Sequence, residues 1–70
     1  MRYAIVIEKA TSNYAAYVPD LPGCVATGET IQETETMIRE AIEFHLEGFR
    51  ADSLPIPPPS SQVEYVEVSV

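Results

Sequence analysis

This chain has 70 residues, which are expected to form one domain, residues 1–70. Its single cysteine, Cys24, excludes an internal disulfide, and it has no run of the roughly 20 apolar residues that cross a bilayer. A net charge of −7 repels phosphate backbones, so we expect no direct nucleic-acid binding and no membrane binding, whereas a basic protein would be attracted. The chain lacks a signal-peptide layout and, being so short, buries only about 60% of its unfolded surface, which predicts a cytoplasmic protein that completes its burial as a homo-oligomer, a dimer or a tetramer.

The first half of the chain predicts three short strands. Residues 3–8 are rich in aromatic and β-branched side chains and apolar on both faces, which is typical of a central strand. A polar turn cluster separates them from residues 14–18, so the first two strands should form a hairpin. The sequence Asp-Leu-Pro-Gly at residues 20–23 then predicts a tight, rigid turn, because proline fixes φ and glycine can adopt a positive φ. Residues 24–27 are the third strand.

Residues 30–50 predict one long amphipathic helix. Thr30 can cap its N-terminus, and Glu33 can reach back to complete a capping box. At about 100° per residue, one apolar stripe faces the sheet, and it contains Ile31, Ile38, Ile42, His45 and Phe49, flanked by Ala41 and Leu46. The opposite face is mostly acidic and includes Glu33, Glu40, Glu43 and Glu47.

The end of the chain predicts a stiff proline-rich tether over residues 53–61 and a fourth strand over residues 63–70. The fold class is therefore α+β with the order β-β-β-α-β. We expect one helix packed on a four-stranded mixed sheet of strand order 3-2-1-4, with the fourth strand parallel to the first. Ala4, Val6, Ala15 and Tyr17 line either the uncovered face of this sheet or the face beneath the helix.

The segment from Pro19 to Thr30 reads Pro-Asp-Leu-Pro-Gly-Cys-Val-Ala-Thr-Gly-Glu-Thr. Together with Tyr3, Tyr17 and the Pro-Ile-Pro exit at residues 55–57, it resembles the N-terminal domain of the HicB family of antitoxins, from about Met1 to Ser60. The resemblance implies a partial ribonuclease-H-like fold. It also implies a partner, a small basic HicA toxin with a double-stranded-RNA-binding-like fold and a catalytic histidine that cleaves messenger RNA, whose active site the antitoxin blocks. An acidic domain suits that task, because it offers negative charge to an RNA-binding surface.

Many members of the HicB family carry a C-terminal DNA-binding module with which they repress their own operon. This chain has eleven residues after Pro59, and none of them is a cation. The sequence is therefore expected to be a short form without that module, which neutralises a toxin without repressing transcription alone.

The sequence gives little support for catalytic activity. Two-metal hydrolysis needs several converging carboxylates, and only Glu8 and Asp20 lie near the predicted strands. Cys24 and the single histidine, His45, are expected to be core residues, and no second ligand stands at metal spacing. We therefore expect no enzyme activity, no cofactor and no metal. The alternatives are a degenerate ribonuclease-H-like hydrolase and an orphan structural or ligand-binding oligomer.

The candidate contact residues belong to two surfaces. Rigid exposed turns often carry recognition, so the turn around Asp20 is one candidate for partner binding. Asp20 itself is better explained as a turn residue that bonds nearby backbone N–H groups. The second candidate for partner binding is the group of four glutamates on the outer side of the helix. An oligomer contact is expected separately, through two apolar helix residues that the sheet does not cover. The partner-binding set is Pro19, Asp20, Leu21, Pro22, Gly23, Glu33, Glu40, Glu43 and Glu47, and the oligomer-contact set is Met37 and Phe44.

Overall fold

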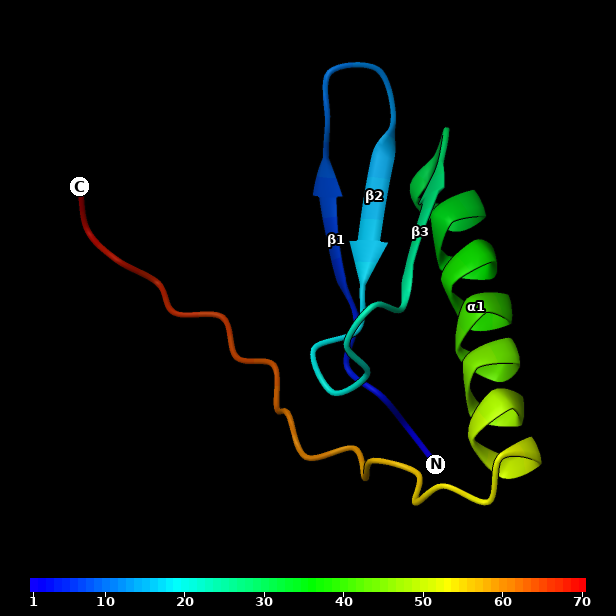
Figure 1. Cartoon of the computed structure of the whole chain (residues 1–70). Helices are drawn as coiled ribbons and strands as arrows, with labels where there is room; N and C mark the ends of the chain where they lie inside the picture. The colour runs from blue at the N-terminus through cyan, green and yellow to red at the C-terminus, as the bar shows by residue number, and fades with distance from the viewer.

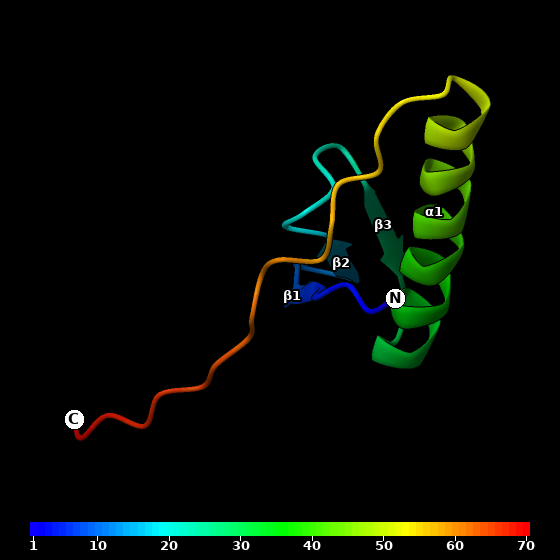
Figure 2. The ribbon, with the colours of Figure 1, turned by 90° about the horizontal axis from the view of Figure 1, so that it is seen from below.

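The computed structural model describes residues 1–70 as three strands and one helix. The strands are β1 (Val6–Lys9), β2 (Tyr14–Tyr17) and β3 (Val25–Gly28), and the helix is α1 (Ile31–Ala51). Both strand pairs are antiparallel, in the order β1-β2-β3. The helix runs beside β3 and contacts β3 and β2 (Figures 1 and 2). It is not apolar enough over a sufficient length to cross a membrane.

The register of the sheet decides which residues face the helix. Ile7, Ala16 and Ala26 are paired across the three strands, and all three belong to the core or pack against it. The neighbouring row points to the other face, because side chains alternate along a strand. That row contains Val6, Tyr17 and the 64%-exposed Val25. Of the four residues whose face the sequence left open, Val6, Ala15 and Tyr17 therefore lie on the uncovered face, and alternation places Ala4 there too.

The core is small and gathers around the turn between β2 and β3. Its buried apolar residues are Ala16, Val18, Leu21, Cys24 and Ile38. The turn closes on itself through backbone bonds, from Leu21 N–H to Val18 C=O at 3.1 Å and from Cys24 N–H to Leu21 C=O at 3.1 Å. Gly23 has φ 84°, the left-handed conformation that favours glycine, so the predicted tight turn is confirmed.

Both ends of α1 are capped. Thr30 Oγ1 accepts from the N–H of Glu33 at 3.0 Å, and Glu33 Oε1 accepts from the N–H of Glu29 at 3.1 Å, so the capping box reaches one residue further back than usual. At the other end, Leu54 N–H bonds to Phe49 C=O at 2.9 Å while Ser53 has φ 55°, as in a Schellman motif. The predicted start and end of the helix are both confirmed to within one residue.

The predicted fourth strand is wrong, and with it the four-stranded sheet of order 3-2-1-4. Residues 63–70 are exposed, pair with no strand and run away from the body of the molecule (Figure 1). The segment leaves from a fixed point at the end of the sheet, where Asp20 accepts hydrogen bonds from Ser60 and Ser61 and the hydroxyl of Tyr3 donates to Pro57 C=O. Because no fourth strand adds, β1 is an edge strand instead of the predicted central strand. It also begins at Val6 instead of Tyr3, because its neighbour β2 ends at Tyr17 and the chain turns there.

Candidate protein-binding site

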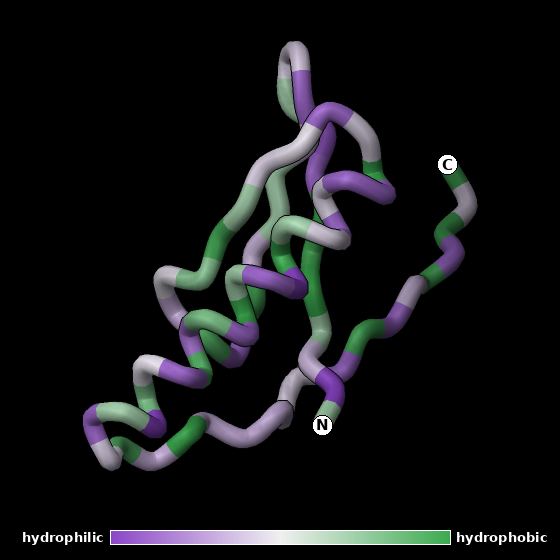
Figure 3. Tube along the Cα trace, turned by 90° about the vertical axis from the view of Figure 1, so that its right-hand side faces the viewer, coloured by the Kyte–Doolittle hydropathy of each residue, from purple (hydrophilic) through white to green (hydrophobic).

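The outward surface of α1 carries negative charge around an exposed aromatic ring. Phe44 is 80% exposed, and Glu40 precedes it by four residues while Glu47 follows it by three, so both acids adjoin it on the helix surface. Glu43 precedes Phe44 directly, and Met37 lies two turns away on the same side and is also exposed. We call Met37, Glu40, Glu43, Phe44 and Glu47 the acidic helix face. Hydrophilic segments recur along α1 when it is viewed from the helix side (Figure 3).

Glu33, which the sequence grouped with these acids, has a structural task. Its carboxylate accepts the hydrogen bond from Glu29 N–H that closes the N-terminal cap. Glu33 is nevertheless exposed, and it begins the row of acids that runs along the helix. The structure thus places all four predicted glutamates on one element, with Met37 and Phe44 among them.

The second predicted surface, the turn at residues 19–23, is only partly exposed. Pro19, Pro22 and Gly23 face solvent, whereas the side chain of Leu21 is 0% exposed and lies in the core. Asp20 is engaged with the far end of the chain. Its Oδ2 accepts from the backbone N–H groups of Ser60 and Ser61 at 3.0 and 2.9 Å, and its Oδ1 accepts from their hydroxyls at 3.2 and 2.8 Å.

These contacts correct the prediction that Asp20 bonds nearby backbone N–H groups, since its partners lie 40 and 41 residues away. Hydrogen bonds from the backbone and hydroxyl of Ser61, followed by those from Ser60, lower the pKa of Asp20 below its usual value of 3.8. The Asp20 carboxylate therefore stays ionised and holds the proline-rich segment against the turn.

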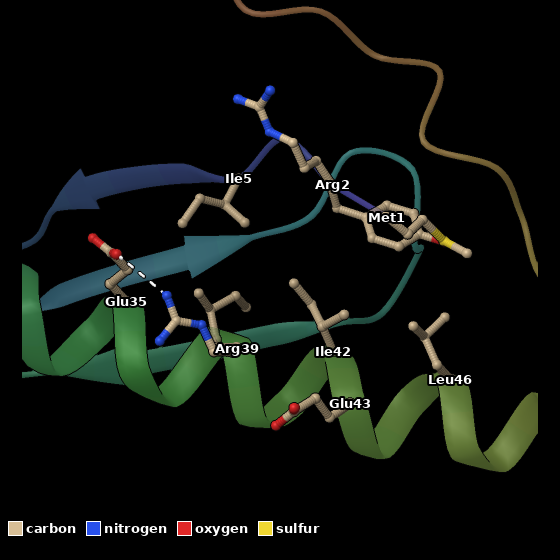
Figure 4. A pocket seen from close by; sticks show the side chains of 10 residues that line it. Met1, Arg2, Ile5, Glu35, Arg39, Ile42, Glu43 and Leu46 are labelled. Carbon is tan, nitrogen blue, oxygen red and sulfur yellow. Dashed lines mark ion pairs between the residues drawn. The ribbon is translucent and has the colours of Figure 1, made fainter.

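A groove that the sequence did not predict opens between the N-terminal segment and α1, with a volume of about 490 Å³. Ile5 lies on one side, and Ile42 and Leu46 lie on the other (Figure 4). At its rim, Arg39 pairs with Glu35 at 3.7 Å. The helix stripe was expected to lie against a four-stranded sheet, but the sheet has three strands and part of the stripe lines this groove instead. The apolar spacing of Ile42 and Leu46 was therefore the only signal for it in the sequence.

The remaining candidate residues offer no reactive centre. Cys24 is buried and unpaired, and burial raises the pKa of its thiol above 9.0, so it is a poor nucleophile at neutral pH. His45 was expected in the core but is half-buried, and its ring packs edge-on against Phe49 at 5.3 Å between centroids. No three His, Cys, Asp or Glu side chains come together as a metal site requires. What the arrangement offers is a surface that another protein can contact.

Comparisons with known proteins agree on one family. The HicB-like antitoxins of bacterial toxin-antitoxin systems match residues 3–69. The chain is 39% identical over 66 residues to an uncharacterized 14.9 kDa protein in the rep-hol intergenic region of Haemophilus phage HP1. It is 32% identical over 69 residues to Antitoxin HicB 2 of Photorhabdus laumondii. These matches cover 94% and 97% of the chain, but the chain spans only half the length of either relative.

Two further matches are shorter. A UPF0150 protein of Helicobacter pylori is 47% identical over 49 residues, which are 70% of this chain and 68% of that protein. Among solved structures, a chain of a "HicA3 and HicB3 toxin-antitoxin complex" superposes with a TM-score of 0.72 at 32% identity, covering 84% of this chain and 70% of that one.

Proposed function

Because this chain belongs to the family of HicB-like antitoxins of bacterial toxin-antitoxin systems, we propose that it binds a small basic HicA-like toxin and masks the toxin's active site and RNA-binding surface. The family is one of antitoxins and not of enzymes. The observation that carries the proposal is the 32%-identical match, at a TM-score of 0.72, to a chain of a toxin-antitoxin complex.

The acidic helix face supports the electrostatic part of this proposal. A toxin that cleaves RNA needs cations to hold phosphates, and glutamates can occupy the same positions. Opposite charges across an interface raise the association rate and exclude wrong partners. On this view Glu40, Glu43 and Glu47 draw the toxin to α1, and the toxin's RNA is repelled by the net charge of −7.

Phe44 supplies what the glutamates lack. Exposed acids contribute little affinity because water and salt screen their charge. A buried aromatic anchor, in contrast, often dominates an interface. Phe44 is exposed in the chain by itself and lies among the acids, so a partner that covers the helix also covers the ring. The exposed residues of the turn, Pro19, Pro22 and Gly23, are proposed as a second contact, which Asp20 and Leu21 support from behind.

The test is co-expression with the product of the adjacent gene, with a purification tag on this chain only. Capture of a small basic protein, together with loss of that protein's RNA cleavage in the complex, is the expected result. The comparison variant combines Phe44→Ala with Glu43→Gln, which keeps the fold because both side chains are exposed, and it should capture less of the toxin. If the toxin is captured but continues to cleave RNA at its free rate, the masking mechanism is wrong. If no basic partner binds, the antitoxin role is wrong for this chain.

A further inference from the structure

We propose that residues 62–70 pair as a β-strand with the open edge of β1 in a second copy of this chain, and that reciprocal pairing of the two copies forms a closed homodimer. The exchange concerns only this chain and needs no toxin. It also uses a surface separate from the acidic helix face, so a dimer leaves that face open.

Residues 62–70 have a sequence that favours a β-strand, but their side chains are exposed and they pair with no strand. It reads Gln-Val-Glu-Tyr-Val-Glu-Val-Ser-Val, and β-branched and aromatic residues of this kind favour strands. Tyr65 is 94% exposed and Val66 is 80% exposed, and hydrophobic residues alternate with polar ones along the segment (Figure 3). Beyond Leu54 no backbone group bonds to another backbone group, and the bonds from side chains to the backbone end at Ser61. An apolar extended segment with free backbone groups is a template for pairing with a sheet edge.

The chain exposes more surface than a compact monomer of its size. Only 7 of the 70 residues are buried, and the chain exposes 5570 Å², whereas a compact monomer of this mass exposes about 4300 Å². The radius of gyration is 13.8 Å, against about 11 Å for a compact chain of this length. If both copies covered this surplus, the total buried area would be about 2500 Å², which lies in the range of stable dimers.

The edge of β1 is the acceptor that the topology leaves open. In the order β1-β2-β3 the two free edges belong to β1 and β3, and α1 runs alongside β3 while nothing lies beside β1 (Figure 1). Arg2 and Lys9 flank this edge, and with Glu8 they leave it net positive. The only charges of the segment are Glu64 and Glu67, so the two surfaces attract each other.

The geometry of the tether favours a second copy over the segment's own sheet. Ser60 and Ser61 are held by Asp20 and Pro57 is held by Tyr3, so the segment begins at a fixed point and then runs away from its own β1 (Figure 2). Nine residues in a strand extend about 30 Å, which is enough to reach a neighbouring molecule. With two-fold symmetry each copy gives one strand and receives one, so no open edge of β1 is left to build a fibre.

Light scattering of the full chain at micromolar concentration tests the stoichiometry. The expected mass is twice the 7.7 kDa of one chain. A variant with Val66→Pro and Val68→Pro should be monomeric, because proline removes the N–H groups that a sheet ladder needs. The variant Val66→Thr keeps that N–H and a β-branched side chain, so it should remain dimeric. Helix content should be equal in all of them, since the segment makes no contact with α1. A monomeric unsubstituted chain, or a dimer that survives both prolines, overturns the proposal.

Nuclear magnetic resonance of a mixture of differently labelled chains tests the pairing itself. We expect intermolecular contacts between residues 63–70 and the β1 edge, and slow amide exchange in the segment that the two prolines abolish. Contacts found only within one chain would overturn the exchange. These readouts use the chain alone, so their failure is distinct from a failure of toxin capture.

Discussion

The carboxylate of Asp20 accepts two hydrogen bonds from Ser61, which lies 41 residues further along the chain, from the backbone N–H at 2.9 Å and from the hydroxyl at 2.8 Å. Ser60 makes the same pair of bonds, at 3.0 and 3.2 Å. One side chain at the β2–β3 turn therefore fixes where the final segment leaves the domain. Because the group is exposed, its importance lies in position more than in stability.

The first prediction concerns the pH at which this attachment is lost. The hydrogen bonds lower the folded-state pKa of Asp20 below 3.8, so the stabilisation is complete above that unfolded value and is lost as the pH falls through the lower folded value. Amide resonances of Ser60 and Ser61 should move together in an acid titration, and Asp20→Asn should weaken the attachment at neutral pH. Glu64→Gln is the control and should leave both resonances unchanged. If the backbone amide of Ser61 exchanged hydrogen at the same rate in the unsubstituted chain and in the Asp20→Asn variant, the attachment would be contradicted.

The second prediction contrasts two glycines. A Cβ added at Gly28 would lie 2.6 Å from Thr34 Oγ1 and 2.7 Å from Thr34 backbone nitrogen, and Thr34 is fully buried. Gly28→Ala should therefore lower the free energy of unfolding by about 2 to 3 kcal/mol through overpacking. At Gly48 an added Cβ meets no atom within 4 Å, and Gly48→Ala should raise it by about 0.5 to 1 kcal/mol because alanine favours a helix. Urea unfolding measures both, and equal effects would refute the close contact at Gly28.

The third prediction concerns the end of α1. Ser53 has φ 55°, a left-handed conformation that costs a residue with a Cβ about 1 kcal/mol and costs glycine little. Ser53→Gly should therefore raise the midpoint of thermal unfolding by several degrees, which circular dichroism would measure. Ser53→Ala retains the Cβ and should give no gain. A lower midpoint for Ser53→Gly would show that the serine stabilises this helix end in some other way.

The local features of this fold could be predicted from the sequence, and the features that depend on distant partners could not. The Thr30–Glu33 cap and the apolar helix stripe are set by residues within a few positions of one another, and so is the turn that ends at Gly23. The strand pattern of residues 63–70 is also local, but whether it pairs depends on where Ser60 and Ser61 are held. Asp20 resembles an ordinary turn residue until those serines are seen beside it, and the groove at Ile42 depends on where the N-terminal segment lies against α1.

The fourth prediction separates charge from contact on the acidic helix face. If the toxin is bound there, changing Glu40, Glu43 and Glu47 together to Gln should lower its association rate about tenfold at low salt and much less at high salt. Phe44→Ala should instead raise the dissociation rate, because it removes an aromatic anchor. Glu35→Gln is the matched control, since it removes a glutamate that pairs with Arg39 at another position around the helix. Surface plasmon resonance distinguishes the rates, and equal effects of Glu35→Gln and the triple variant would exclude this face.

The fifth prediction concerns Cys24, whose buried thiol has its pKa raised above 9.0 by desolvation. Because the raised value favours the neutral thiol in the folded chain, this contribution to stability is present below the unfolded pKa and is lost as the pH rises through the folded one. A thiol reagent should therefore label the native chain slowly and the urea-unfolded chain at the rate of a free cysteine. Cys24→Ala should lower the free energy of unfolding by about 1 to 2 kcal/mol through the cavity that it leaves. Rapid labelling of the native chain would mean that the β2–β3 turn opens often. Both the core and the anchor at Asp20 depend on that turn being closed, so the labelling rate also reports on the anchor of the final segment.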